Sequence, residues 1–253
     1  MSHQDSYYKQ NEDYAEFLSG WDPTFYGKYA DALVPQPAHG RALDVGCGVG
    51  QVVRRLDENG VEAHGVDVSG PNIAKAREVS ARCQIYDGRR LPFEDNTFDS
   101  VGALNVLEHV DEPEAFIRDL VRVTRSGGKI VLSSPNFFRV LGVGDYHHTM
   151  RGLANKWRNF RRLMFKRDQM RRCPDEVRFD RMQPIIRENF QPDDDAIVRT
   201  NMLEMMFFLK RAGCAIQSAH CTDRYVFKPL HILLNLFPTK YAMFNSFIVA
   251  RKS

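Results

Sequence analysis

An acidic residue and three glycines have the types and spacing that a cofactor-binding loop requires. The segment LDVGCGVG places Asp44 two residues before Gly46, and Gly48 and Gly50 follow at alternating positions. A dinucleotide-binding turn has the pattern G-x-G-x-x-G, but Gln51 stands where its last glycine should be. The Asp44 carboxylate would repel a pyrophosphate and attract an ammonium or sulfonium ion. The loop therefore favours a ligand that is cationic or zwitterionic at this end, and a nicotinamide-dependent oxidoreductase is the weaker alternative.

Two further carboxylates end the next two predicted strands. Asp67 follows the glycine loop by about twenty residues, at the position where an acidic residue accepts hydrogen bonds from a ribose diol. Asp87 ends the third strand, where its carboxylate could accept a hydrogen bond from an exocyclic amine such as that of adenine. The carboxyl ends of parallel strands line one ligand crevice. We therefore expect the three acids to bind different parts of one ligand.

These segments, in this order and spacing, resemble the class I S-adenosylmethionine (SAM) dependent methyltransferases, in particular the small-molecule group related to quinone-biosynthesis enzymes. The family's D-x-G-x-G-x-G motif is matched from Asp44, and its D-A-x-x-L-P-F motif is matched from Asp87. LNVLEHVDEPEAF and SGGKIVLSSPN resemble the family's fourth and fifth strands with the intervening helix. The resemblance implies SAM as cofactor, S-adenosylhomocysteine as product, and these cofactor-binding residues: Asp44, Gly46, Cys47, Gly48, Asp67, Val68, Asp87, Gly88, Leu104 and Asn105.

Two departures from the family pattern bear on the ligands. Gly88 replaces the usual alanine, which leaves the backbone N–H for the adenine edge in place. After the fifth strand the chain reads SSPN at 133–136, which is unlike the N-P-P-Y signature of enzymes that methylate nucleobase or glutamine nitrogens. The second departure argues against methylation of amides and bases.

Strand-like runs alternate with helical patterns along most of the chain. The expected strands are 41–45, 62–66, 82–86, 98–106, 129–134, 214–220 and 244–252, and the expected helices are 50–60, 69–81, 112–124 and 201–213. Alternation with crossovers of this length predicts an α/β fold, a parallel sheet with helices on both faces. The resemblance implies a Rossmann-like, doubly wound, mostly parallel seven-stranded sheet with an antiparallel last strand and a helical insertion after the fifth strand.

We predict a single methyltransferase domain over residues 1–253. Its expected parts are an N-terminal helical and aromatic cap at 1–40, the SAM-binding core at 41–136, a basic helical insertion at 137–198, and a C-terminal helix with the last two strands at 199–253. No strand-like run is visible in the insertion, which is expected to form a lid or a substrate region.

Candidate acid–base residues follow the fifth strand in the segment DYHHTM. A histidine that titrates near neutral pH could remove a proton from a substrate hydroxyl, so His147 or His148 is the predicted general base, with Tyr146 as an accessory. Glu108 and His109 form another candidate pair, but a structural role is favoured because the resemblance assigns their segment to the scaffold. A nucleophilic Cys47 is disfavoured, because methyl transfer from SAM is a direct displacement.

The insertion contains a strongly basic segment. Residues 151–172 hold nine lysines and arginines against one aspartate, and Leu153, Trp157, Phe160 and Met164 recur at helical spacing. The favoured interpretation is a lid helix whose apolar stripe packs on the domain while its basic face is solvated. An arginine cluster that binds a phosphate or carboxylate of the substrate, and contact with an anionic membrane surface, remain open.

Other features limit the range of functions. The net charge of +3 makes nucleic-acid binding a weak expectation, and the aromatic residues of the N-terminal segment are expected to cap the cofactor pocket or join the core: Tyr7, Tyr8, Tyr14, Trp21 and Tyr26. Five scattered cysteines with no C-x-x-C pair predict no disulfide framework and no zinc site, and the acidic run 193–195 is expected to be a polar loop that leads into a helix. The absence of a secretory pattern and of a spanning apolar stretch predicts a cytoplasmic protein.

The expected reaction is O-methylation of a small or glycan-like acceptor that bears negative charge. C- or N-methylation of a small molecule is the first alternative. A SAM-binding module without catalysis, whose basic lid binds a partner, is the second.

Overall fold

A seven-stranded sheet forms the centre of the molecule. The computed structural model describes residues 12–20, 24–36, 40–142, 147–185, 194–222, 228–236, 238–243 and 245–253. The strands of the sheet are β1 (Arg41–Val45), β2 (Glu62–Asp67), β3 (Cys83–Ile85), β4 (Phe98–Leu104), β5 (Thr124–Pro135), β8 (Cys214–Thr222) and β9 (Asn245–Lys252). Their order is β3-β2-β1-β4-β5-β9-β8, and β9 runs antiparallel to both of its neighbours. The expected α/β fold with an antiparallel last strand is confirmed.

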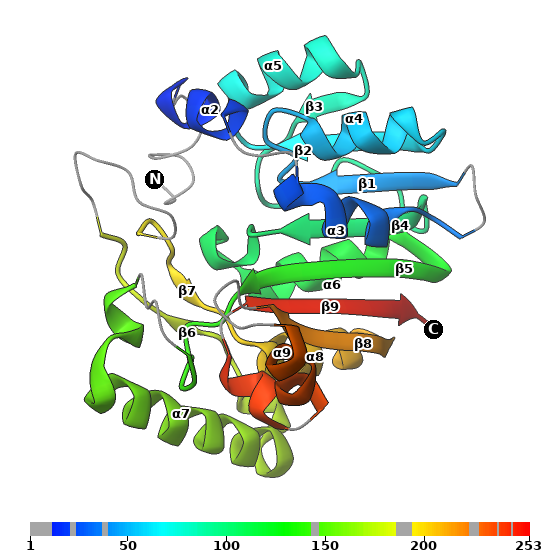
Figure 1. Cartoon of the computed structure of the whole chain (residues 1–253). Helices are drawn as coiled ribbons and strands as arrows, with labels where there is room; N and C mark the ends of the chain where they lie inside the picture. The colour runs from blue at the N-terminus through cyan, green and yellow to red at the C-terminus, as the bar shows by residue number, and fades with distance from the viewer. Residues whose placement is uncertain are drawn as a thin grey trace.

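Helices cover both faces of this sheet (Figure 1). The helices α3 (Thr24–Leu33), α4 (Gln51–Glu58) and α5 (Gly70–Val79) contribute to one buried apolar cluster, and α6 (Pro113–Val123) and α8 (Met202–Arg211) contribute to the other. Continuous apolar strands such as β4, which is buried along nearly its whole length, belong to sheets covered in this way. A short helix α2 (Glu12–Ser19) lies near α5.

The parallel strands carry the expected ligand residues to one edge of the sheet. Val45 pairs with Val66 of β2 and with Ala103 of β4, so β1, β2 and β4 end at the same level. In Figure 1 this edge is the left side of the sheet. Residues that follow these strands are therefore brought together although they lie far apart in the sequence.

The insertion lies on the same side as the carboxyl ends of these strands (Figure 1). It contains the 3-10 turns η2 (His148–Met150) and η3 (Pro174–Glu176), the helix α7 (Gly152–Arg172), and the strands β6 (Asp180–Arg181) and β7 (Val198–Arg199). The two strands pair antiparallel as a separate two-stranded sheet. No strand was expected in the insertion, because two-residue strands are too short to show an alternating pattern.

The C-terminal part adds elements that the sequence analysis did not predict. Between β8 and β9 lie the helix α9 (Lys228–Leu236) and the 3-10 helix η4 (Pro238–Ala242). Within the described ranges, no helix combines the length and the apolar character needed to cross a membrane.

Candidate active site

The glycine loop after β1 uses its backbone N–H groups within the protein. The N–H groups of Gly46 and Cys47 both donate to the carbonyl oxygen of Val66, at 2.8 and 3.0 Å, and the N–H of Gly48 donates to Asp67 Oδ2 at 2.9 Å. A loop that binds pyrophosphate directs such N–H groups toward the ligand. The geometry therefore supports the interpretation of a loop that is not built for a dinucleotide.

Glycine is required at the start of this loop. Gly46 has a φ of 74°, a conformation that L-residues rarely adopt, and a Cβ atom there would collide with the Val106 side chain. Asn105, which follows β4, also has a positive φ, 53°. The turns after β1 and β4 thus approach each other closely at the edge of the sheet.

Asp44 is a buried carboxylate at this edge. Its side chain is 3% exposed, and Tyr29 of α3 donates its hydroxyl hydrogen to Asp44 Oδ1 at 2.8 Å. Burial raises the pKa of Asp44 to about 7; the hydrogen bond from Tyr29 lowers it, and the nearby charge of Asp67 raises it. A sulfonium or ammonium group beside it would favour the ionised form. This carboxyl group therefore suits a cationic ligand.

Asp67 links the glycine loop to the start of α5. Besides the Gly48 N–H, its carboxylate accepts hydrogen bonds from the Ser69 N–H at 2.9 Å and from Asn72 Nδ2 at 3.4 Å, both at Oδ1. Burial raises its pKa, and the backbone hydrogen bonds from Ser69 and Gly48 oppose that effect. Each carboxylate oxygen has two lone pairs, so Oδ2 can accept one more hydrogen bond. The residue can thus hold one ribose hydroxyl while it fixes the loop.

Asn105 supplies an acceptor that has no partner among the described residues. Its Oδ1 atom is buried and makes no hydrogen bond within the described part of the chain. A buried amide oxygen without a partner costs free energy unless a ligand or water satisfies it. Since it follows β4, at the edge that also carries Asp44 and Asp67, the set of acceptors fits a polar, positively charged ligand such as SAM.

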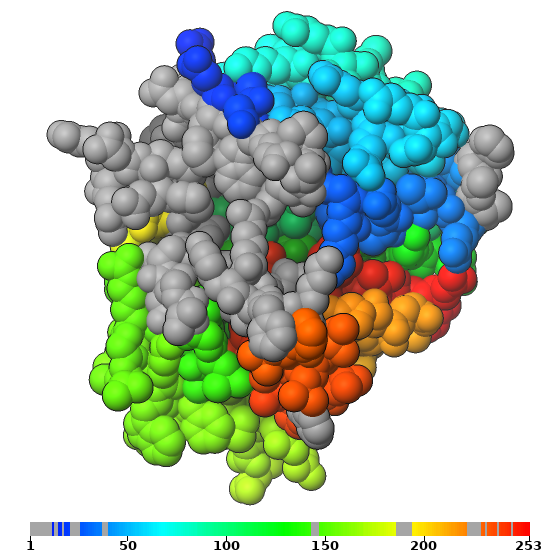
Figure 2. Space-filling model, in the orientation of Figure 1, coloured from blue at the N-terminus to red at the C-terminus, as the bar shows by residue number. Residues whose placement is uncertain are grey.

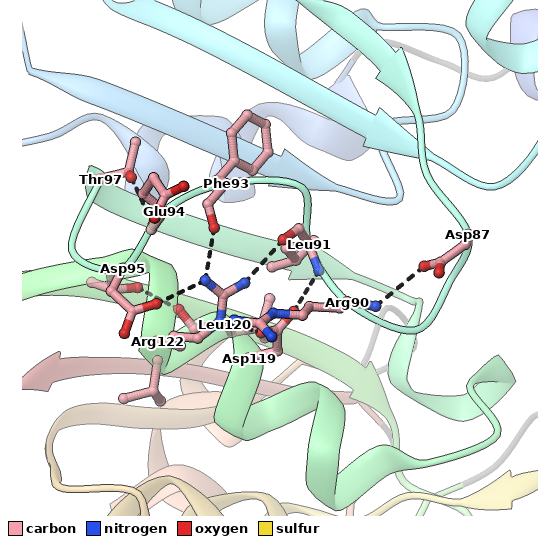
Figure 3. A network of polar contacts seen from close by, with 12 residues as sticks. Asp87, Arg90, Leu91, Phe93, Glu94, Asp95, Thr97, Asp119, Leu120 and Arg122 are labelled. Carbon is pink, nitrogen blue, oxygen red and sulfur yellow. Dashed lines mark hydrogen bonds and ion pairs between the residues drawn. The ribbon is translucent and has the colours of Figure 1, made fainter.

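The loop after β3 is held by one arginine (Figure 3). Arg122 of α6 donates to the carbonyl oxygens of Phe93 and Leu91 at 2.7 and 2.9 Å, and to the Asp119 carboxylate at 2.6 Å. Asp119 in turn accepts the Leu91 N–H at 2.6 Å. This role of Arg122 was not expected from the sequence, because the two carbonyl groups that it binds lie about thirty residues away along the chain.

Asp87 begins this loop and is exposed. Its Oδ1 accepts the N–H groups of Arg89 and Arg90 at 2.8 and 3.2 Å, and the first of these bonds is the main reason that its pKa is lowered. Its other oxygen, Oδ2, takes no part in these bonds. A charged acceptor at the end of β3 therefore stands next to the site formed by β1, β2 and β4.

The sequence of the strands and loops that build this site matches known proteins. Residues 43–132 match a family model described as a methyltransferase domain. Norajmaline N-methyltransferase of Rauvolfia serpentina is 37% identical over 101 residues, which are 36% of this chain and 35% of that protein. Ubiquinone biosynthesis O-methyltransferase of Xanthomonas axonopodis pv. citri is 33% identical over 108 residues, 40% of this chain and 45% of that protein.

A solved structure extends the likeness to the whole fold. The SAM-dependent methyltransferase from Mesorhizobium loti superposes with a TM-score of 0.58 at 17% identity, covering 93% of this chain and 100% of that one. Residues 43–132 thus match a methyltransferase domain, and the fold around them resembles that of a SAM-dependent methyltransferase. The chain spans less than half of the length of the two curated relatives.

The other residues that the family resemblance assigned to the methyltransferase cofactor have smaller roles in the structure. The Cys47 side chain is buried against Gly65, and its thiol donates to the carbonyl oxygen of Gly48 at 3.8 Å. The neighbouring Cys83 thiol, together with burial, raises the pKa of the Cys47 thiol. Only the backbone of Cys47 could face a cofactor, and a nucleophilic role is further disfavoured. Val68 and Leu104 are half-buried beside the apolar core, and Gly88 has a positive φ.

The N-terminal aromatic residues are described only in part. Tyr26 is half-buried and packs on the apolar cluster below α3 and α4, as one of the two expectations had it. Tyr7, Tyr8 and Trp21, together with the side chain of Tyr14, lie outside the described residues.

The three predicted acid–base residues are placed differently from one another. His147 is 2% exposed, and its Nδ1 lies 2.7 Å from Thr149 Oγ1, at the start of η2. Its ring contacts Phe137 edge-on, with 5.2 Å between centroids. His148 is exposed, and Tyr146 lies outside the described residues. His147 thus has a clear structural role, and its role as a base stays a prediction.

A second acidic and basic cluster lies directly after β4. His109, in η1 (Leu107–His109), contacts two carboxylates: its Nδ1 is 3.5 Å from Asp195 Oδ2 and its Nε2 is 3.8 Å from Glu108 Oε1. Glu108 is fully buried, and its Oε2 accepts the Ser134 hydroxyl at 2.8 Å. Burial raises the pKa of Asp195 to about 7.

The aspartate of this cluster comes from the acidic run 193–195. A polar loop was expected there, but Asp194 and Asp195 are buried in the turn before β7, and Asp193 lies outside the described residues. The Ile197 N–H donates to the Glu108 carbonyl oxygen at 2.9 Å, which brings this turn against η1. Sequence spacing gives no sign of this contact, because the two segments are about ninety residues apart.

Proposed function

We propose that this protein transfers the methyl group of SAM to an oxygen of a small or glycan-like acceptor that bears negative charge. When bound, SAM supplies an electrophilic methyl group on a positively charged sulfur. The observation that carries the proposal is the set of buried acceptors at one sheet edge, formed by Asp44, Asp67 and Asn105. The two carboxylates complement the positive charge of the cofactor, and holding both reactants in line can lower the barrier by roughly 7 to 11 kcal/mol.

The reaction needs a group that removes a proton only if the oxygen that receives the methyl group belongs to a hydroxyl. In that case the bond between the methyl carbon and the acceptor oxygen would form as the bond between that carbon and the cofactor sulfur breaks. S-adenosylhomocysteine would be the leaving group, and the hydroxyl proton would pass to a histidine. His148 is the exposed member of the predicted pair, whereas His147 is held by Thr149. His109 is a second candidate, because it follows β4 and because the carboxylates of Glu108 and Asp195 would stabilise its protonated ring.

The acceptor atom is the least constrained part of the proposal. The two curated relatives are named as an N-methyltransferase and an O-methyltransferase. A neutral amine or an activated carbon would need different help from the protein, and a carboxylate would need no base. We favour oxygen because the segments that follow β4 and β5 both carry histidines that could accept a proton, His109 in the first and His147 and His148 in the second.

The experiment has two steps. Calorimetric titration with S-adenosylhomocysteine should show one saturable site. Incubation with methyl-labelled SAM and fractionated acceptor pools should then give a labelled product whose methyl carbon shift, measured by NMR, reports an O–CH3 group. Tight cofactor binding with no labelled product from any pool would favour the non-catalytic module instead.

Histidine variants assign the base. His148→Ala and His109→Ala should be compared under single-turnover conditions, with S-adenosylhomocysteine affinity as the control for an intact cofactor site. Loss of about 100-fold in rate with unchanged affinity would identify the base. Unchanged rates in both variants would point to a carboxylate, carbon or amine acceptor.

A further inference from the structure

Helix α7 carries its apolar stripe on the solvent side. Leu153, Trp157, Phe160 and Met164 are spaced by four, three and four residues, so they share one side of the helix. Their exposed fractions are 86%, 62%, 41% and 40%. The rings of Trp157 and Phe160 stack on each other with 5.7 Å between centroids. The expected packing of this stripe on the domain is therefore wrong.

Polar side chains face the protein instead. Lys166 is 2% exposed, and its Nζ lies 2.8 Å from Asp180 Oδ1 and 2.7 Å from Glu204 Oε1. Arg162 makes a bidentate ion pair with Asp180, with both N–O distances at 2.6 Å. Asn159 is buried one turn before Leu163, the apolar residue of α7 that is buried beside it. These contacts fix which side of α7 faces outward.

Their geometry also limits the alternative that α7 binds an anion of the substrate. The inward cations Arg162 and Lys166 are neutralised by carboxylates of β6 and α8. A substrate phosphate or carboxylate would have to displace those partners. Lys156 is half-buried and donates to the carbonyl oxygen of Gly142 at 2.7 Å, whereas the other basic residues of α7 are exposed.

The outer side of α7 combines the apolar stripe with positive charge. Arg161, Arg167 and Arg171 are exposed and form no ion pair within the described part of the chain. The single acidic residue of the helix, Asp168, pairs with Arg172 at 2.8 Å. Large exposed apolar patches mark interaction sites, and this one attracts a negatively charged partner.

We propose that the outer side of α7 docks on a bilayer surface that contains anionic lipids. With 21 residues, α7 is about 31 Å long and presents a linear stripe to a plane instead of a groove. Aromatic and leucine side chains can enter the interface between headgroups and acyl chains while arginines bind phosphates, which is the pattern of helices that lie on membranes. Helix α9 adds exposed apolar residues: Leu230, Ile232, Leu233 and Leu236.

Helices α7 and α9 lie in the same half of the molecule (Figure 1). Figure 2 shows α7 along the lower left edge and α9 at the lower centre, both away from α4 and α5 at the top. A second copy of this chain is a poorer occupant, because matching α7 to α7 would bring arginines together. Like charges in such an interface oppose association.

Vesicle co-sedimentation tests this proposal. The full chain should bind vesicles of phosphatidylcholine with phosphatidylglycerol, bind neutral phosphatidylcholine vesicles weakly, and be released by high salt. Trp157→Ser with Phe160→Ser should lower the partition coefficient about tenfold or more, since two aromatic side chains no longer enter the interface. Arg161→Glu with Arg167→Glu should lower it by at least about 30-fold, because each basic residue near an anionic surface contributes roughly a factor of five.

The matched control is Arg54→Glu with Arg118→Glu, exposed residues of α4 and α6 that change the net charge equally. This control should retain most of the binding. Affinity for S-adenosylhomocysteine should be unchanged in all variants, so the docking proposal and the proposed function can fail separately. Equal binding to both vesicle types, no binding, or a dimer in light scattering that the Trp157 variant abolishes would overturn the proposal.

Discussion

The cofactor half at 41–136 and the insertion at 137–198 both bury charged side chains, but they give them different partners. Asp44 and Asp67 are held by a tyrosine, backbone N–H groups and an amide, and no cation pairs with them in the described part of the chain. In the insertion, Lys166 and Arg162 are paired with Asp180 and Glu204. The first arrangement keeps negative charge ready for a cationic ligand. In the second arrangement the cations and carboxylates pair with each other and hold α7 in place.

Removing one partner of the insertion's ion pairs should have the largest effect. Lys166→Ala leaves Glu204 buried without its cation, and we expect a loss of about 3 to 5 kcal/mol in the free energy of unfolding. Urea denaturation followed by circular dichroism measures it. The double variant Lys166→Met with Glu204→Gln should recover part of the loss. A loss below about 1 kcal/mol in the single variant would show that the pair does not anchor α7.

Removing a charge from the cofactor half should change binding more than stability. Asp67→Ala loses the Oδ2 acceptor and the contact to Gly48, so the affinity for S-adenosylhomocysteine should fall on the order of 100-fold. Asp57→Ala is the matched control, because this aspartate pairs with Arg82 away from the cofactor edge. Calorimetry on both variants makes the comparison. Equal affinities would mean that the ligand does not reach Asp67.

The raised pKa of Asp44 predicts a pH effect in the cofactor half. With a pKa of about 7, this carboxyl group is mostly ionised at pH 8 and mostly protonated at pH 6, so SAM should bind about tenfold more weakly at pH 6. The contribution of Asp44 to the free energy of unfolding has the opposite pH dependence. Its pKa is about 7 in the folded protein and 3.8 in the unfolded chain, so between these values the folded protein binds more protons. The folded protein therefore loses stability as the pH rises through this range. Calorimetric titrations with SAM between pH 6 and pH 8 measure the effect on affinity. The SAM affinity of the Asp44→Asn variant should not change over this range.

The smallest effect is expected at the exposed end of the cofactor site. Asp87→Asn keeps an oxygen for the N–H groups of Arg89 and Arg90 but loses the charge, so affinity for S-adenosylhomocysteine should fall about fivefold. The melting temperature should stay unchanged. An affinity equal to that of the unaltered protein would place the adenine end of the cofactor elsewhere.

The cofactor half could be predicted from sequence because its signals are local. Strands, glycine turn and acidic residues come in a fixed order over about ninety residues, and each strand ends near a residue with a distinctive type. The hydrogen bonds that those residues make could not be predicted from the sequence. The Gly48 N–H on Asp67 and the contacts of Arg122 with the loop after β3 depend on how distant segments meet.

The insertion shows the limit of periodicity. The spacing of Leu153, Trp157, Phe160 and Met164 predicts a helix with an apolar side, and the helix is present. Which side faces the protein was decided by Asp180 and Glu204, which lie in other elements and satisfy Lys166. In the fold, Lys166 is buried with two carboxylates, and the apolar stripe on the opposite side of α7 is left exposed. Asp195 beside His109 was missed for the same reason.

The way α7 is attached has an evolutionary consequence. Its inner contacts involve a few polar residues on α7, β6 and α8. The strands that carry the cofactor residues, β1, β2 and β4, belong to the seven-stranded sheet, which does not include β6. Mutations on the outer side of α7 can therefore accumulate without disturbing either the anchor or the cofactor edge. Descendants of such a chain could acquire new binding partners through substitutions on one helix, while the residues at the edge formed by β1, β2 and β4 stay as they are.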